Sequence, residues 1–296
     1  MHLSQYQFSP VCFKHFYINL FSAKLGGDLE EDPLAPLDII AQFIESFHDA
    51  IEKGNPHLIL EVLQSFFVNL SYKNPSGQDC ICLLSEESCS CLEDSPIMPF
   101  IITCLQNYTI IEIHIRALQL LDYLICQNRD IFVNMFFASG NDGILQILQF
   151  INPQGNREIV SRSIQIVYIL SQYEQSYPLI TDPGFVENFL SFCLEFMRIA
   201  PDDLAVIISY YTASLLKSII ETMFKESPNL LFSPKIKNQI YTILSYFYFP
   251  RNEIKFPLFH DIFPHLQKIA IGCFEIMSID YDFITKIFPN VISMTS

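Results

Sequence analysis

Four cysteines lie in one short acidic stretch, GQDCICLLSEESCSCLED, as Cys80-x-Cys82 and Cys89-x-Cys91. Four thiolates can hold a zinc ion in tetrahedral geometry. Structural zinc sites favour about two to four residues between the members of each pair, whereas a single residue separates them here. We therefore expect a mobile acidic loop over about residues 73–94. Its four thiols stay candidates for a zinc clip or for a regulatory disulfide.

The carboxylates in this stretch affect its other side chains. Negative charge near a thiol raises its pKa, so the surrounding acids make the thiolates less available, although they also attract a cation. The same acids make Ser90, in Ser90-x-x-Glu93, a candidate for an acid-directed kinase. A phosphate at Ser90 would add further negative charge to the loop.

Signatures of catalysis are missing from the rest of the sequence. It contains no P-loop, no G-x-G-x-x-G, no G-x-S-x-G and no H-E-x-x-H. His260 and His265 are the closest pair of histidines, but two ligands on one helix face need a spacing of about three or four, and Pro264 is expected to interrupt the segment. Nothing supplies a nucleophile beside His260 and Asp261. We expect no enzyme and no cofactor.

Charge restricts the class of partner. The chain has 32 acidic and 17 basic residues, for a net charge of −15. Such a surface repels nucleic-acid phosphates and anionic membranes, so neither is an expected partner. If charge selects a partner, it selects a basic protein or peptide.

Composition indicates the compartment and the degree of burial. Half of the residues are hydrophobic and 17% are charged, so many helices must be buried on more than one side. The nine cysteines are odd in number and mostly lie in apolar contexts, which is typical of free thiols in a reducing cytoplasm or nucleus. Apolar runs such as LAVIISYYTASLL stop short of the ~18 residues of a membrane span.

The spacing of apolar residues predicts helices along almost the whole chain. Between Pro36 and Gly54, apolar residues recur at intervals of about three and four, the pattern of one buried helix face. Four side chains each stand directly before a proline, which suits a helix cap followed by the first helical residue. These pairs are Asn55-Pro56, Ser95-Pro96, Asp182-Pro183 and Ser233-Pro234.

An internal repeat is the most informative pattern. The segment Ile97–Leu124 aligns without gaps with Gly143–Leu170 at an offset of 46 residues. Matched positions include Arg116 with Arg162 and Gln119 with Gln165. A third copy starts near Phe185. Each copy is predicted to be a shorter helix, a connection and a longer helix.

This pattern resembles the armadillo-like, or HEAT-type, helical repeats, whose period is about 40–47 residues. The resemblance implies an all-α fold, an α-solenoid of stacked armadillo-like repeats in which neighbouring helix pairs share one core. It implies a single repeat domain over residues 36–296, after a partly ordered N-terminal segment over residues 1–35. It also implies a non-enzymatic scaffold that binds a protein or peptide on its concave face.

The longer helix of each repeat would line that concave face. On the matched helices, a stripe of amide, aromatic and cationic side chains could hold an extended peptide. The candidates are Arg116, Gln119, Tyr123, Arg162, Gln165, Tyr168, Gln172, Tyr210 and Lys217. Nuclear-import adaptors with this architecture use recurring Trp and Asn pairs, and this chain has no Trp. An acidic transport or chaperone-type adaptor for basic cargo is the alternative, and a metalloprotein with a zinc clip is another.

Overall fold

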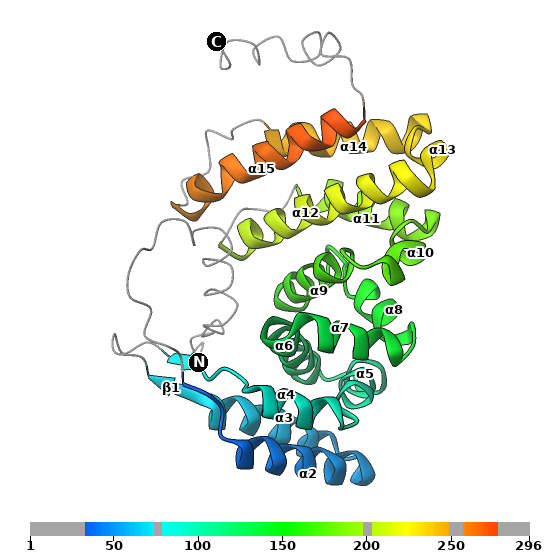
Figure 1. Cartoon of the computed structure of the whole chain (residues 1–296). Coiled ribbons are helices and arrows are strands. Elements are labelled where there is room, and N and C mark those ends of the chain that lie inside the picture. Colours follow the sequence, from blue (N-terminus) through cyan, green and yellow to red (C-terminus); the bar gives the residue numbers. More distant parts are fainter. Residues whose placement is uncertain (1–32, 74–78, 198–202, 249–256, 278–296) are drawn as a thin grey trace. The chain divides into compact units, whose positions relative to one another are not determined.

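The computed structural model describes residues 33–73, 79–197, 203–248 and 257–277, and these residues are mostly helical, as predicted (Figure 1). The predicted N-terminal segment lies almost entirely outside them. Contacts divide the chain into two units, residues 1–146 and 147–296. The predicted extent of a single repeat domain therefore stays a prediction.

The first unit contains six helices and a short hairpin among its described residues, and a further helix crosses its boundary. In chain order these are α2 (Leu37–Lys53), α3 (Pro56–Leu70), β1 (Ser71–Lys73), β2 (Asp79–Ile81), α4 (Glu86–Glu93), α5 (Ile97–Asn107), α6 (Ile111–Gln127), α7 (Arg129–Ala138) and α8 (Asp142–Gln149).

The described part of the second unit is built from helices. They are α9 (Arg157–Leu170), the 3₁₀ turn η1 (Glu174–Ser176), α10 (Tyr177–Ile180), α11 (Pro183–Phe196), α12 (Asp203–Glu226), α13 (Pro228–Leu231), α14 (Pro234–Tyr248) and α15 (Pro257–Ile276). The long helix α12 packs against α9 and α15, and α11 packs against α14.

Aromatic side chains form the core of the first unit. The rings of Phe43 and Phe66 lie 4.3 Å apart, and those of Phe47 and Phe100 lie 4.9 Å apart. Phe66 also meets the ring of Tyr123 edge-on, at 5.9 Å. These contacts join α2, α3, α5 and α6 around one apolar centre. Edge-to-face and offset aromatic pairs add about 0.5–1.5 kcal/mol each beyond the area they bury.

Helix α2 buries one face, as its sequence predicted, but with a different set of residues. Ile40 and Phe47 are buried as expected, together with Phe43 and Ala50. Leu37 and Ala41, which belong to the predicted apolar face, are exposed instead. The helix ends because Gly54 adopts a left-handed conformation, with φ of 58°. Its N–H donates to the carbonyl oxygens of Ala50 and Ile51, which satisfies two groups that a helix end leaves open.

Two of the four predicted caps are confirmed, and α14 begins at Pro234, directly after Ser233. Asn55 accepts a hydrogen bond from the N–H of His57, and Asp182 accepts one from the N–H of Phe185, both at 3.0 Å. The prediction for Ser95 was wrong. Its hydroxyl donates instead to the carbonyl oxygen of Leu92 at 2.7 Å, so it serves the end of α4 rather than the start of α5.

The mobile loop expected over residues 73–94 is another incorrect prediction. Strand β1 pairs with β2 in antiparallel register, with Tyr72 opposite Cys80, and Leu83 forms a parallel bridge with Leu34. Helix α4 follows, and Ser85 caps it by accepting from the N–H of Ser88 at 3.0 Å. Only residues 74–78 of the expected loop lie outside the described residues. The hairpin also means that the fold is mostly helical rather than all-α.

Helix α12 corrects the expectation that no segment reaches membrane-spanning length. The segment Leu204–Glu226 is 23 residues long and has a mean hydropathy of 1.3. By length and composition this segment could cross a membrane, but 72% of its most apolar stretch is buried inside the protein. Helices α7 and α8, which are bent by 100° relative to each other, are long and apolar enough to cross a membrane only if the two are counted as one broken span. Buried core helices of soluble proteins can be equally long and apolar, so length and composition alone do not make α12 a membrane span.

Candidate functional site

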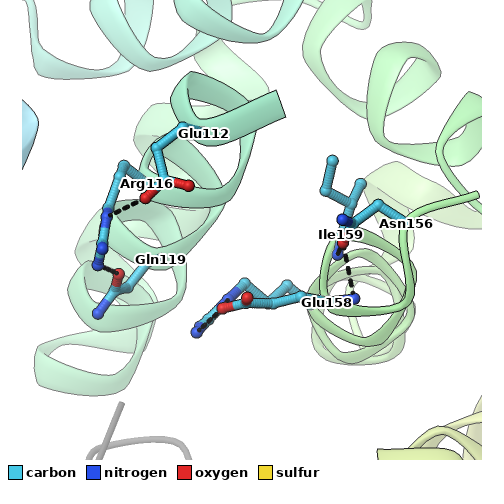
Figure 2. A network of polar contacts seen from close by, with 7 residues as sticks. Glu112, Arg116, Gln119, Asn156, Glu158 and Ile159 are labelled. Atoms are coloured by element: carbon cyan, nitrogen blue, oxygen red, sulfur yellow. Dashed lines mark hydrogen bonds and ion pairs between the residues drawn. The ribbon is translucent and has the colours of Figure 1, made fainter. Parts of the chain in front are cut away.

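Arg116 forms a small polar network on α6 (Figure 2). Its Nε donates to Oε1 of Glu112 at 3.1 Å, and its Nη1 donates to Oε1 of Gln119 at 2.9 Å. The side chains of Arg116 and Glu112 are 32% and 39% exposed. Because the guanidinium is held from both sides along one helix, its orientation is fixed by contacts within α6.

The same pair recurs on α9. Arg162 Nη2 donates to Oε1 of Glu158 at 3.0 Å, and Glu158 lies 46 residues after Glu112, as Arg162 lies after Arg116. At the start of α9, Oδ1 of Asn156 accepts from the N–H groups of Glu158 and Ile159 (Figure 2). Sequence reasoning matched the arginines and glutamines but missed the glutamates. The same offset would have found them.

Four of the nine predicted groove residues are not on an open surface. Tyr123 is 1% exposed, and the other three are 4–6% exposed, namely Gln119, Arg162 and Gln165. Helix α6 is buried without interruption over residues 117–125, and α9 over residues 159–167. A helix covered on all sides has no solvated stripe. The prediction that these four side chains line an accessible groove was therefore wrong.

Tyr168, Gln172, Tyr210 and Lys217 are half-buried or exposed, and α9 packs directly against α12. Gln172 Nε2 donates to the hydroxyl of Ser218 at 3.4 Å, and that hydroxyl donates to the carbonyl oxygen of Ser171 at 3.2 Å. Burial raises the pKa of Tyr210, and nearby Tyr168 adds to this effect. The structure therefore brings part of the predicted stripe together on the α9–α12 pair.

The thiols of the acidic stretch are mostly inside the protein. Cys80 and Cys82 are 8% exposed and Cys89 is 5% exposed, while Cys91 is half-buried. Burial, and then the charges of Glu86 and Glu93, raise the pKa of Cys89. Across the described parts of the chain, no three His, Cys, Asp or Glu side chains gather in a way that could hold a metal ion. The zinc clip is therefore not formed by these residues.

Tyr123 contributes to the packing of this thiol-rich region. Its hydroxyl donates to the carbonyl oxygen of Cys82 at 2.7 Å, which ties α6 to the end of the hairpin. Burial, together with the nearby thiols of Cys82 and Cys89, raises the pKa of Tyr123. The Tyr123 hydroxyl is therefore a structural hydrogen-bond donor at this position.

His114 is half-buried, and its Nε2 contacts the carbonyl oxygen of Tyr108. Burial lowers the pKa of His114, and this contact partly offsets the effect. Pro264 does not interrupt its segment, because α15 runs through it. The side chains of His260 and Asp261 lie outside the described residues.

Acidic charge is concentrated in the first unit. Residues 1–146 contain 18 acidic and 6 basic residues, a net charge of −12, while residues 147–296 contain 14 and 11, a net charge of −3. On α2, four acids lie on the face opposite the buried one, at intervals of about three, four and seven residues. We call this the α2 acidic stripe: Asp38, Glu45, Asp49 and Glu52, all exposed.

The α2 acidic stripe is only partly neutralised. Lys53 Nζ forms an ion pair with Oδ2 of Asp49 at 2.6 Å. Within the described residues, Asp38, Glu45 and Glu52 have no basic side chain at ion-pair distance. The stripe extends about 21 Å along the helix, from the rise of ~1.5 Å per residue. It is a linear array of carboxylates suited to an extended or helical basic segment.

Comparison with known proteins adds no assignment. No family model, no curated protein and no solved structure matches this chain. Function is therefore inferred from the chemistry of the described residues.

Proposed function

We propose that the protein is a non-enzymatic interaction module whose first unit binds a basic segment of another protein. The observation that supports this proposal is the α2 acidic stripe, where three exposed carboxylates lack basic partners among the described residues. The net charge of −12 in the first unit adds a long-range attraction for a basic partner. This is the chemistry of an adaptor for basic cargo.

Exposed ion pairs are individually weak, so the stripe must act through several of them. Each exposed pair is worth about 0.2–1 kcal/mol and is screened by salt. Three or four pairs along one helix would give modest affinity with a strong dependence on ionic strength. Such binding is reversible and rapid, because charge complementarity acts mainly on the rate of association.

The test compares two variants with the same change in charge. The first is Asp38→Asn with Glu45→Gln and Glu52→Gln on α2. The control is Glu174→Gln with Glu226→Gln and Glu275→Gln, three exposed acids of the second unit. Fluorescence anisotropy measures the affinity of each for a labelled Lys/Arg-rich peptide at low and moderate salt.

We expect the α2 variant to lose about tenfold in affinity at low salt, corresponding to ~1.4 kcal/mol, and the control to lose much less. Equal losses of affinity in the two variants would mean that the peptide responds to net charge and not to the α2 acidic stripe. No loss in either variant would exclude the stripe as the binding surface.

A second candidate function is favoured by the α9–α12 pair and by the recurring Glu–Arg pair on α6 and α9. We propose that these helices belong to an armadillo-like α-solenoid and that Tyr168, Gln172, Tyr210 and Lys217 contact the backbone of a bound peptide. Gln172→Ala with Lys217→Ala should then weaken a partner recovered by pull-down from the native cytoplasm or nucleus. The matched control is Gln106→Ala with Lys268→Ala, which alters exposed residues elsewhere. If both variants retain the partner equally, this surface is not used.

A further inference from the structure

Three serines at α4 differ sharply in their surroundings. The Ser85 hydroxyl is used as the helix cap, and it also contacts the Ser88 hydroxyl at 3.0 Å. Ser88 itself is 0% exposed. Ser90 is exposed on the outer face of the helix. The sequence places acids after both Ser85 and Ser90, so only the structure distinguishes the accessible hydroxyl from the one engaged in capping.

Ser90 is surrounded by carboxylates on its own helix. Glu86 and Glu87 lie four and three residues before it, and Glu93 and Asp94 lie three and four residues after it. All four are exposed. Residues about three and four apart are neighbours on a helix surface, so all four carboxylates flank this one hydroxyl.

We propose that Ser90 is a phosphorylation site for an acid-directed serine kinase, and that its phosphorylation releases α4 from α2 and α7. In this step the Ser90 Oγ–H bond breaks and its proton passes to the base of the kinase. An Oγ–P bond forms as the bond between the γ-phosphorus of ATP and its bridging oxygen breaks, and ADP leaves. The product is a phosphate monoester carrying a charge of about −1.5 to −2 at neutral pH.

The release follows from where the phosphate is placed. Helix α4 spans only eight residues, so its stability depends on packing. Cys89 and Leu92 are buried, at 5% and 0% exposure, and the helix packs against α2 and α7. Like charges at these helix spacings are destabilising, and negative charge in the second half of a helix also opposes its dipole. A phosphate at Ser90 meets both penalties at once.

One basic residue could oppose this outcome. Arg129 is exposed at the start of α7, which packs against α4. A phosphate that reached Arg129 would hold α4 in place instead of releasing it. The experiment must therefore separate modification of Ser90 from its structural effect.

The first measurement maps the modified residue. The full chain is incubated with a purified acid-directed serine kinase and ATP, and the product is analysed by mass spectrometry. We expect phosphate on Ser90 and its complete loss from this peptide in Ser90→Ala. Ser139 is an internal comparison, because it is exposed and followed by Asp142, but its hydroxyl donates to Met135 at 2.9 Å. Labelling of Ser85 or Ser139 at the rate of Ser90 would overturn the assignment.

The second measurement uses the thiol of Cys89 as a reporter of α4. Alkylation of the native protein should be about tenfold faster at Cys89 after phosphorylation. Cys104, which is 0% exposed on α5, should not change. Ser85→Ala removes the cap and should accelerate Cys89 alkylation without phosphate, as a positive control. An unchanged or slower rate at Cys89 in the phosphorylated protein would overturn the release.

Discussion

At the scale of single residues, burial decides which polar groups make contacts inside the protein and which face solvent. Tyr123 has the aromatic and hydrogen-bonding character of a groove residue, yet its ring packs against those of Phe66 and Phe67. Its hydroxyl donates a hydrogen bond to the carbonyl oxygen of Cys82. The side chain of Arg116 is 32% exposed, whereas that of its counterpart Arg162 is 7% exposed.

Removing the Tyr123 hydroxyl should destabilise the first unit. In Tyr123→Phe the ring remains, but the buried carbonyl oxygen of Cys82 loses its donor. A buried acceptor left unsatisfied costs about 1–3 kcal/mol, so we expect the free energy of unfolding to fall within that range. Urea denaturation measures this change. Tyr108→Phe is the control, because Tyr108 contacts His114 through its main chain; an equal loss there would refute the role of the Tyr123 hydroxyl.

At the scale of elements, hydrogen bonds at helix ends account for the boundaries in this fold. Asn55, Ser85, Asn128, Asn156 and Asp182 each accept from a main-chain N–H at the start of a helix. These contacts are local, so they form wherever the sequence provides them. The hairpin is different, because it exists only when β1 pairs with β2, a separate segment of the chain.

The cap of α9 gives a direct test of this local control. Asn156→Ala removes the acceptor for the N–H groups of Glu158 and Ile159 and should cost about 1 kcal/mol of stability. Asn156→Asp should retain most of it, because aspartate also caps well and favours the positive end of the helix. Thermal unfolding measures both. Asn107→Ala, an exposed change at the last residue of α5, should have little effect; a loss as large as that of Asn156→Ala would contradict the capping interpretation.

At the scale of the whole molecule, the chain combines an apolar interior with an unequal distribution of charge. Half of its residues are hydrophobic, and most of its net negative charge lies in the first unit. Buried thiols are part of this interior. Burial raises the pKa of both Cys104 and Cys273 to about 12. Lys217 lowers the pKa of Cys273 and Glu221 raises it, but burial is the largest influence.

These raised pKa values predict a loss of stability at alkaline pH. Below pH of about 9 the thiols are protonated in both the folded and the unfolded chain, so they add no pH dependence. Between about 9 and 12 the unfolded thiols ionise while the folded ones keep their protons, so stability falls with rising pH. Each fully shifted group contributes a slope of ~1.4 kcal/mol per pH unit.

Urea unfolding between neutral and alkaline pH measures this slope. Cys104→Ala with Cys273→Ala should make it shallower, because the alanines do not titrate. The double variant is also expected to be less stable at neutral pH, so the comparison is of slopes and not of absolute stability. An unchanged slope would show that other groups cause the alkaline loss.

The sequence by itself determined the local features of this protein. The spacing of apolar residues predicted α2, Asn55 and Asp182 predicted their caps, and the offset of 46 residues predicted the recurrence of Arg116 as Arg162. These features depend on hydrogen bonds and periodicities within a few turns of the chain. Net charge is equally a property of the sequence, and it suggested a basic partner.

Only the tertiary structure decided which of these residues meet solvent. Arg116 and Arg162 occupy matched positions, but the covering of α9 leaves Arg162 buried. The acidic stretch was expected to be a loop because its cysteine spacing does not suit a zinc site, yet residues Glu86–Glu93 form α4, which packs against α2 and α7. The same packing buries Cys89 and leaves Ser90 exposed. Burial depends on elements distant in the sequence, so no local pattern could predict it.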